Sequence, residues 1–212
     1  MPFGTLPRSP SVAEACPVTF PGVGDVNVTE KCPAERRAYP AGQHGQNQGR
    51  ERKASEYAKQ LREKQKVKRM YGLSERQFRN TFAAVTREPG VKGTNLLVAL
   101  ETRLDNIVYR LGFAASRKAA RQLIGHGHVQ VNGRRVDVAS YRVVPGEEVR
   151  VSPESRELIS VKLAQESASR GAPVSWLSID QAKAAGRLVE RPTRETIPIN
   201  AQEQLIVELY SK

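Results

Sequence analysis

The sequence predicts an α+β protein in which helices come first and mainly antiparallel strands follow. Its first half contains serine-capped segments whose apolar residues recur at spacings of three and four, as in amphipathic helices. From Val129 onward apolar residues alternate, and Asn132-Gly133 between two such runs is a strong hairpin signal. A chain of 212 residues has room for one domain or two small ones.

Two charged helices are predicted in the first half. Ser55 precedes "EYAKQLREKQKVKRM", and Gly72 follows where a helix C-terminal cap belongs. Ser74 and Gln77 have the spacing of a capping box, in which each residue satisfies a free backbone N–H group of the other. This box predicts a second helix that runs to about Arg87.

The strongest helical pattern begins at Thr94 with "TNLLVALETRLDNIVYRLGF", and Gly112 lies at its predicted C-terminal cap. We expect one continuous helix here. Ser116 then caps a further helix that ends at Gly125.

Period-two patterns follow. "VQV" and "VDV" flank the predicted hairpin turn, and Pro145-Gly146 suits a type II turn between "YRVV" and "EEVRV". Pro153 is placed to start another helix, since proline is tolerated in the first turn. Beyond it we expect a strand around Trp176–Ile179, and a last helix that Asn200 and Glu203 open with a capping box.

The charge balance indicates a polyanionic partner. The chain has 34 Lys and Arg against 22 Asp and Glu, a formal net charge of +12. Nucleic acid and an anionic membrane surface both fit such an excess. The sequence has no apolar run of membrane-spanning length, and prolines interrupt the N-terminal stretch where a secretory signal would lie. We therefore predict a soluble cytoplasmic nucleic-acid binder that does not bind membranes.

Metal binding and catalysis find little support. Cys16, Cys32 and His44 are scattered, without any CxxC pair, so we predict two ordinary reduced thiols and no metal. His126 and His128 have no third ligand nearby, and capping a helix or stacking on a nucleotide fits them better. No glycine-rich phosphate loop, nucleophile elbow or carboxylate pair occurs. We predict no enzymatic activity, no cofactor and no small-molecule substrate.

Five cations cluster around the helix after Ser116 and the hairpin that follows it. These are Arg117, Lys118, Arg121, Arg134 and Arg135. A merely solvated face would intersperse acids, and the first turn of a helix already favours anions. We therefore predict that these side chains face solvent as one phosphate clamp, so that replacing them weakens RNA binding and leaves stability nearly unchanged.

The stretch "ETRLDNIVYRLGFAASRKAARQLIGHGHVQVNGRRVD" resembles the RNA-binding module named after bacterial small-subunit ribosomal protein S-four. That module also occurs in pseudouridine synthases, tyrosyl-tRNA synthetases and heat-shock RNA binders. The flanks "ERRAYPAGQHGQ", "LREKQKVKRMYGLSERQFRN" and "LIVELYSK" resemble the S-four family itself, over residues 32–212. Only Cys32 falls on the cysteine pattern that forms a zinc site in some members.

The resemblance implies a helical domain with an S-four-type RNA-binding domain inserted into it, the latter having two helices followed by a small, mainly antiparallel sheet. We assign residues 32–93 and 191–212 to the helical domain and 94–190 to the inserted one. Residues 1–31 are predicted to be extended or poorly ordered, because they are rich in Pro, Gly, Ser and Val.

The resemblance also implies a function. It implies a constituent of the small ribosomal subunit that binds 16S-type ribosomal RNA as a primary binder, nucleates assembly of the subunit body and contributes to translational accuracy. Implied further partners are messenger RNA, where it enters the subunit, and small-subunit protein five.

Specific residues follow from the basic pattern and the resemblance together. The predicted RNA-binding residues are Arg36, Arg37, His44, Arg50, Arg52, Lys53, Arg62, Lys66, Arg69, Arg76, Arg79, Arg117, Lys118, Arg121, His126, His128, Arg134 and Arg135. Arg50, Arg52 and Lys53 are the ones expected near messenger RNA, although a merely solvated loop would also fit them. Leu205, Leu209 and Tyr210 are the predicted protein interface, and simple packing into the helical domain is compatible with that role.

Two other classes of RNA-binding protein fit the sequence less well. A pseudouridine synthase needs a catalytic Asp in a large mixed sheet, and too few residues follow the module to build one. A stand-alone RNA-binding stress protein would not need the basic helices before the module or the matching tail.

Overall fold

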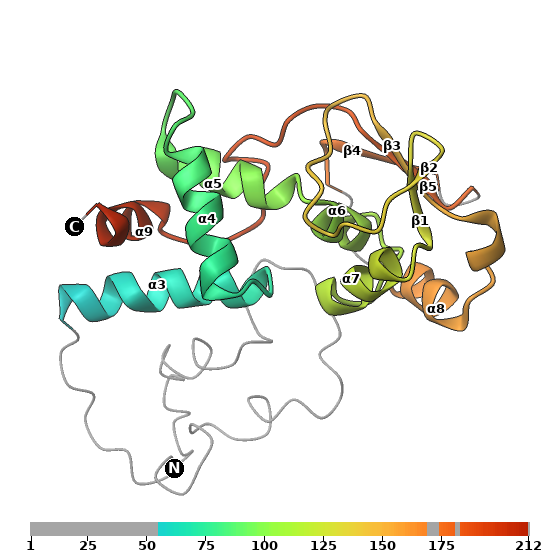
Figure 1. The fold of residues 1–212 in the computed structure, drawn as a ribbon, viewed down its shortest axis with the longest axis horizontal. Coiled ribbons are helices and arrows are strands. Elements are labelled where there is room, and N and C mark those ends of the chain that lie inside the picture. Colours follow the sequence, from blue (N-terminus) through green and yellow to red (C-terminus); the bar gives the residue numbers. More distant parts are fainter. Residues whose placement is uncertain (1–54, 169–173, 181–182, 212) are drawn as a thin grey trace, which may run out of the picture.

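The computed structural model describes residues 55–168, 174–180 and 183–211 (Figure 1). The predictions for residues 1–54, which include both cysteines and six of the predicted RNA-binding residues, lie outside this range. Within it, no helix is long and apolar enough to cross a lipid bilayer.

The two predicted charged helices are confirmed as α3 (Glu56–Met70) and α4 (Glu75–Val85). The Ser55 hydroxyl accepts a hydrogen bond from the Ala58 N–H group, and Ser74 and Gln77 form the expected reciprocal capping box. Gly72 ends α3 with φ +62, a conformation that favours glycine. These boundaries were predictable because each depends on residues within one helical turn.

The single helix expected from Thr94 to Gly112 is instead two helices, α5 (Lys92–Glu101) and α6 (Leu104–Arg110). Between them Arg103 is extended and forms an isolated antiparallel bridge with Arg142. The Leu104 N–H group donates to the Tyr141 carbonyl at 2.8 Å. The apolar spacing continues across this break, so the pattern alone indicates one helix.

The next elements agree with the sequence. Helix α7 (Arg117–Gly125) has Ser116 as its N-cap. Strands β1 (Val129–Val131) and β2 (Arg134–Arg135) form the hairpin, and its turn residues Asn132 and Gly133 both have positive φ. Strand β2 stops at Arg135, short of the expected alternation through Val138.

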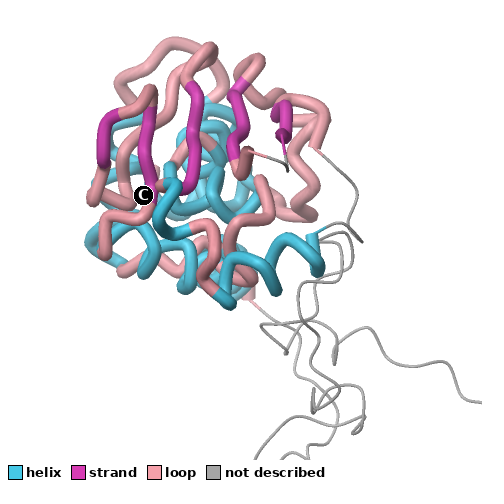
Figure 2. The backbone as a smooth tube through the Cα atoms, turned by 90° about the vertical axis from the view of Figure 1, so that its right-hand side faces the viewer, coloured by secondary structure: helices cyan, strands magenta, loops and turns pink. Residues whose placement is uncertain are grey.

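The sheet continues through β3 (Glu148–Val151), β4 (Leu177–Asp180) and β5 (Ala185–Leu188). Its order is β2-β1-β3-β5-β4, and every neighbouring pair is antiparallel. The α+β class and the antiparallel sheet are thereby confirmed. Figure 2 shows the strands side by side, with helices packed behind them.

Two later predictions need correction. Pro153 opens only a 3-10 turn (Pro153–Ser155), and helix α8 (Ile159–Ala168) begins after it. The last helix, α9 (Glu203–Tyr210), has Gln202 as its N-cap without a side-chain hydrogen bond. The expected capping box is absent because the helix begins only at Glu203, which makes Glu203 its first residue instead of its third. The Glu203 carboxylate accepts from Arg194 Nε at 2.9 Å.

Two separate hydrophobic cores divide the described chain. One joins α3, α4, α5 and α9, and its fully buried side chains include Val67, Phe78, Leu97 and Ile206. The other lies between the sheet and helices α6, α7 and α8. The chain therefore leaves the helical domain, forms the inserted domain and returns to complete the first core with α9, as expected.

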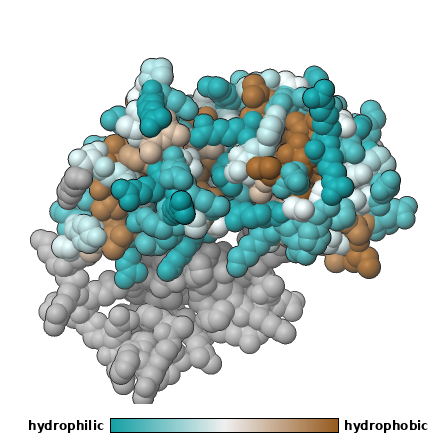
Figure 3. Space-filling model, in the orientation of Figure 1, coloured by the Kyte–Doolittle hydropathy of each residue, from teal (hydrophilic) through white to brown (hydrophobic). Residues whose placement is uncertain are grey.

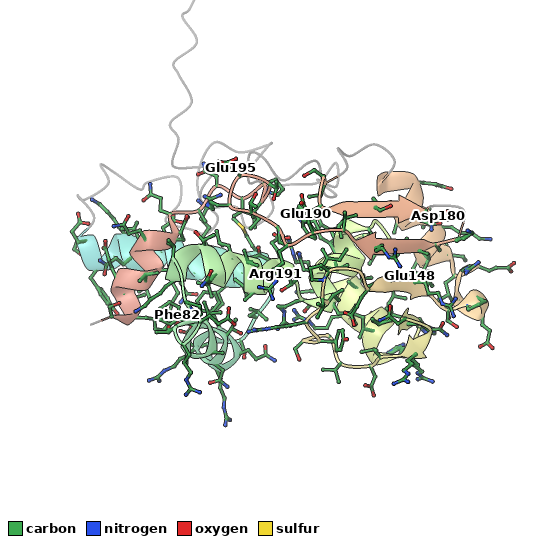
Figure 4. All side chains as sticks on the ribbon, turned by 90° about the horizontal axis from the view of Figure 1, so that it is seen from above. Phe82, Glu148, Asp180, Glu190, Arg191 and Glu195 are labelled. Atoms are coloured by element: carbon green, nitrogen blue, oxygen red, sulfur yellow. The ribbon has the colours of Figure 1, made fainter. Side chains whose placement is uncertain are left out.

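Residues before the break between α5 and α6, at Thr102–Leu104, pack into the first core, and residues after it pack into the second. The inserted domain therefore starts at this break and not at residue 94, where its start was predicted from the sequence. Helix α5 packs with the helical domain. On the return, the labelled Glu190 and Arg191 lie between the helical half and the sheet half of the molecule (Figure 4).

Candidate nucleic-acid interface

Three of the five clustered cations are exposed at α7 and the hairpin. Lys118 lies in the first turn of α7, and Arg134 and Arg135 form β2. Neither the Lys118 ammonium nor the Arg134 guanidinium has a hydrogen bond or ion pair with another described residue. The hydrophilic surface of this region is visible in Figure 3. The Lys118 and Arg134 side chains can reach an anion without giving up a contact in the protein.

The C-terminal end of α7 contacts the hairpin at Gly127. Gly127 has φ +77, and its N–H group donates to the Ile124 carbonyl at 2.8 Å to close the helix. The Arg135 guanidinium occupies the space that a Cβ of residue 127 would need. It donates to the His126 carbonyl at 3.2 Å. Gly127 therefore permits Arg135 to lie across the helix end.

Arg117 and Arg121 are only partly exposed, and contacts within the protein hold their guanidinium groups. The Arg117 guanidinium lies 5.0 Å from the ring centroid of Tyr71 and 4.6 Å from that of Tyr109. Arg121 forms an ion pair with Asp105 at 2.7 Å. The prediction of five equivalent solvent-facing cations is therefore wrong for these two, because acceptors distant in the sequence bind their guanidinium groups.

The two histidines have different surroundings. His128 Nδ1 lies 2.7 Å from the Ser155 hydroxyl, and the exposed His126 ring lies 6.0 Å from that of His128. In the described part of the chain, no group of three His, Cys, Asp or Glu residues could hold a metal ion. It is the His126 backbone, not its imidazole, that caps α7.

A second set of predicted cations lies on the helical domain. Arg62 and Arg69 on α3, and Arg76 and Arg79 on α4, are exposed. Lys66 is half-buried, with its ammonium 3.5 Å from the Glu63 carboxylate. Helices α3 and α7 lie along the same edge of the molecule in Figure 1. The helical and the inserted domain therefore both contribute cations to the surface.

The remaining predicted residues, Arg36, Arg37, His44, Arg50, Arg52 and Lys53, lie outside the described residues.

A buried polar network, which was not predicted from the sequence, lies at the junction of the two domains. The Glu101 side chain is fully buried, and it accepts from Arg110 Nη2 at 2.9 Å, the Tyr71 hydroxyl at 2.7 Å and Asn106 Nδ2 at 2.6 Å. Asp105 is also buried, and it pairs with Arg103 at 2.9 Å. The signal in the sequence was the presence of two acids inside the most apolar helical pattern of the chain.

This network shifts the pKa values of its members. Burial by itself would raise the pKa of Glu101, but the adjacent Arg110 guanidinium and then the Arg117 charge hold it below its usual value. Burial, followed by the charge of Glu101, raises the pKa of Tyr71 well above its usual value. At neutral pH Glu101 is therefore a carboxylate and Tyr71 a neutral hydroxyl that donates to it.

The predicted protein-interface residues lie on α9. The Tyr210 ring stacks on Phe82 with centroids 4.6 Å apart, and its hydroxyl donates to Glu75 at 3.2 Å. Figure 4 labels Phe82, which lies on α4. Leu205 and Leu209 are half-buried, and Ile206 is fully buried in the core. Ile206 and Tyr210 therefore pack into the helical domain, whereas Leu205 and Leu209 are not part of its core.

Leu205 also lines an open groove of about 650 Å³ between the first turn of α5 and α9. Val91, which is 70% exposed, forms part of its rim, and Leu205 and Val207 are the other large apolar residues of the lining. Polar and charged side chains, among them Lys92 and Glu208, complete it. A groove of this kind can accept an apolar side chain from another protein.

Comparison with known families agrees with this division of the chain. Residues 18–101 match the family model described as Ribosomal protein S4/S9 N-terminal domain, and residues 102–149 match the S4 domain. The boundary between the two matches coincides with the break between α5 and α6. The fold and the exposed cations thus belong to a protein class that joins these two domains.

Full-length relatives specify the family. The chain is 51% identical over 190 residues to small ribosomal subunit protein uS4 of Thermus thermophilus, covering 89% of this chain and 90% of the relative. It is 52% identical over 188 residues to the protein of the same name from Thermodesulfovibrio yellowstonii, covering 87% of each. The chain belongs to the uS4 family. These relatives carry the name of a ribosomal protein, and neither family model describes an enzyme.

Proposed function

We propose that this protein is a constituent of the small ribosomal subunit in the cytoplasm, where it binds the 16S-type ribosomal RNA directly. The observation that carries the proposal is the exposed cations of α7 and β2, in particular Lys118 and Arg134, which have no acidic partner among the described residues. Membership of the uS4 family supports the same conclusion.

The mode of recognition follows from where the cations lie. Lys118 and the His126 end of α7 are about 12 Å apart, at about 1.5 Å of rise per residue. Arg135, which binds the His126 carbonyl, therefore lies at the opposite end of α7 from Lys118. Cations this far apart contact different phosphates and do not surround a single one. Base edges of double-helical RNA are hidden in a deep groove, so proteins read mostly its backbone geometry. We propose that two domains with cations at set positions recognise the phosphate arrangement of an RNA junction.

Substitution of Lys118 tests this proposal. We expect Lys118→Glu to reduce affinity for protein-free ribosomal RNA by roughly ten- to hundredfold, because one charge-assisted contact is lost. The slope of log affinity against log salt should become shallower by somewhat under one unit. Binding to RNA free of other proteins also tests the proposed role as a primary binder that nucleates assembly.

Lys183→Glu is the matched control. Lys183 is 77% exposed next to β4, and β4 and β2 form opposite edges of the sheet. We expect this control to bind almost as the wild type does. Equal affinity and equal salt slope for Lys118→Glu and Lys183→Glu would contradict the proposed interface, and absence of the tagged wild type from small subunits on sedimentation would contradict the proposed function.

Two finer roles are proposed for other parts of the chain. Arg50, Arg52 and Lys53 are proposed to contact messenger RNA where it enters the subunit. This proposal is supported by their basic sequence, whose resemblance to the family was described above. The groove beside Leu205 is proposed to receive small-subunit protein five and to influence translational accuracy through that contact. Its support is the exposed Val91 and the half-buried Leu205, which give the groove an apolar part next to α9.

A further inference from the structure

Arg121 connects the two domains through hydrogen bonds that use most of the N–H donors of its guanidinium. From α7 in the inserted domain, its Nη1 donates to the Gly72 carbonyl at 2.7 Å and its Nη2 to the Tyr71 carbonyl at 3.0 Å. These carbonyls end helix α3 of the helical domain, where the helix leaves acceptors unpaired and its dipole favours a cation. Arg121 therefore caps a helix of the other domain.

The same guanidinium is also held from its own domain. Arg121 Nε and Nη2 donate to Asp105 Oδ2 at 3.1 and 2.7 Å. Arginine has five N–H donors, and these four hydrogen bonds leave one of them for any other acceptor. The Asp105 carboxylate, whose side chain is only 3% exposed, is shared between Arg121 and Arg103 and so compensates part of their positive charge. A phosphate that approached Arg121 would meet that carboxylate as well.

Arg117 makes a second connection at the same junction. Its guanidinium lies between the rings of Tyr71 in the helical domain and Tyr109 in the inserted domain, and both contacts are within cation–π distance. Its Nε donates to Asn106 Oδ1 at 2.8 Å. Asn106 in turn donates to the Glu101 carboxylate, so this connection joins the buried network described above.

We propose that Arg121 and Arg117 are positioning residues that set the orientation of the two domains, and that they influence RNA affinity through this orientation and not by contacting phosphate. The inference rests on the proposed function. Exposed cations on α3, α4, α7 and β2 match one RNA surface only when the two domains are held at one angle. If the angle between the domains is already fixed in the free protein, less conformational entropy is lost when RNA binds.

Two substitutions separate positioning from phosphate contact. Asp105→Asn removes an anion that touches no RNA under either hypothesis. If Arg121 contacts phosphate, this change removes a competing charge and should tighten binding. If Arg121 positions the domains, the change loosens the junction and should weaken binding by roughly tenfold. Arg121→Lys keeps the charge, but a single ammonium cannot reach all three acceptors of the guanidinium.

For Arg121→Lys, positioning predicts affinity roughly tenfold weaker with the salt slope of the wild type, since no phosphate contact is lost. Phosphate contact predicts nearly unchanged affinity. Lys118→Gln on the same helix is the control, and its salt slope should become shallower. Thermal melts establish that each variant is folded at the assay temperature.

The distance between the domains provides a readout that does not depend on RNA. Dyes attached at Asn80→Cys and Ser140→Cys, two exposed positions in the different domains, report it by energy transfer once Cys16 and Cys32 are replaced by Ser. We expect a broader distance distribution for Asp105→Asn and Arg121→Lys than for the parent.

Tighter RNA binding by Asp105→Asn, or an unchanged distance distribution in both variants, would overturn the inference. Failure of the wild type to bind ribosomal RNA would instead overturn the proposed function, and the distance measurement would still test the junction.

Discussion

Replacing Glu101 by Gln should destabilise the protein far more than a typical surface change. The Glu101 side chain is 0% exposed and its partner Arg110 is 8% exposed, so this ion pair is shielded from water. The substitution leaves the Arg110 guanidinium buried without a counter-charge, and it weakens the hydrogen bonds from Tyr71 and Asn106. Removing one partner of a buried pair costs about 3–5 kcal/mol in the free energy of unfolding.

Thermal denaturation followed by circular dichroism measures this effect. For a chain of this size, each kcal/mol shifts the melting temperature by about 2–4 °C, so we expect a decrease of roughly 6–20 °C. The control is Glu88→Gln, which breaks the Arg142–Glu88 pair between side chains that are 45% and 47% exposed. That change should cost less than about 1 kcal/mol.

The difference between wild type and Glu101→Gln should depend on pH in a defined direction. The folded-state pKa of Glu101 lies below its ordinary value of 4.5, so the charged carboxylate stabilises the fold above that value. This contribution is lost as the pH falls through the folded-state pKa. A loss of less than about 1 kcal/mol at neutral pH, or a difference that grows as the pH falls below 4.5, would refute the reasoning.

Two further predictions concern the finer roles proposed above. Neutralising Arg50, Arg52 and Lys53 to Gln should leave the melting temperature unchanged and slow translation through a stable messenger hairpin, measured against an unstructured messenger; equal rates on both would contradict the proposed contact. Leu205→Lys places a charge in the groove beside α9 and should alter misreading in a reporter assay, whereas Leu163→Lys on the exposed side of α8, where Leu163 is 56% exposed, should not. Equal misreading in the two leucine variants would remove the support for a partner in that groove.

Features set by neighbouring residues could be predicted from the sequence. Ser55, Ser74 and Ser116 begin helices because their hydroxyls accept from N–H groups within the first turn of the same helix. Asn132 and Gly133 form the hairpin turn because both tolerate positive φ. The basic character of α7 and β2 could also be predicted, because it depends only on the residue types in these two segments.

Features set by distant residues were decided only in the folded chain. The break between α5 and α6 occurs at Arg103, which pairs with Arg142. The local spacing of apolar residues does not indicate this pairing. Arg117 and Arg121 resemble Lys118 in the sequence, yet Asp105 lies beside Arg121 only after α6 and α7 have packed, and Tyr71 lies beside Arg117 only after the two domains have packed together. The sequence by itself determined the helices, the hairpin and the excess of positive charge. Tertiary structure decided which cations are held at the domain junction and which remain exposed, because a guanidinium binds whichever acceptors the fold brings within reach.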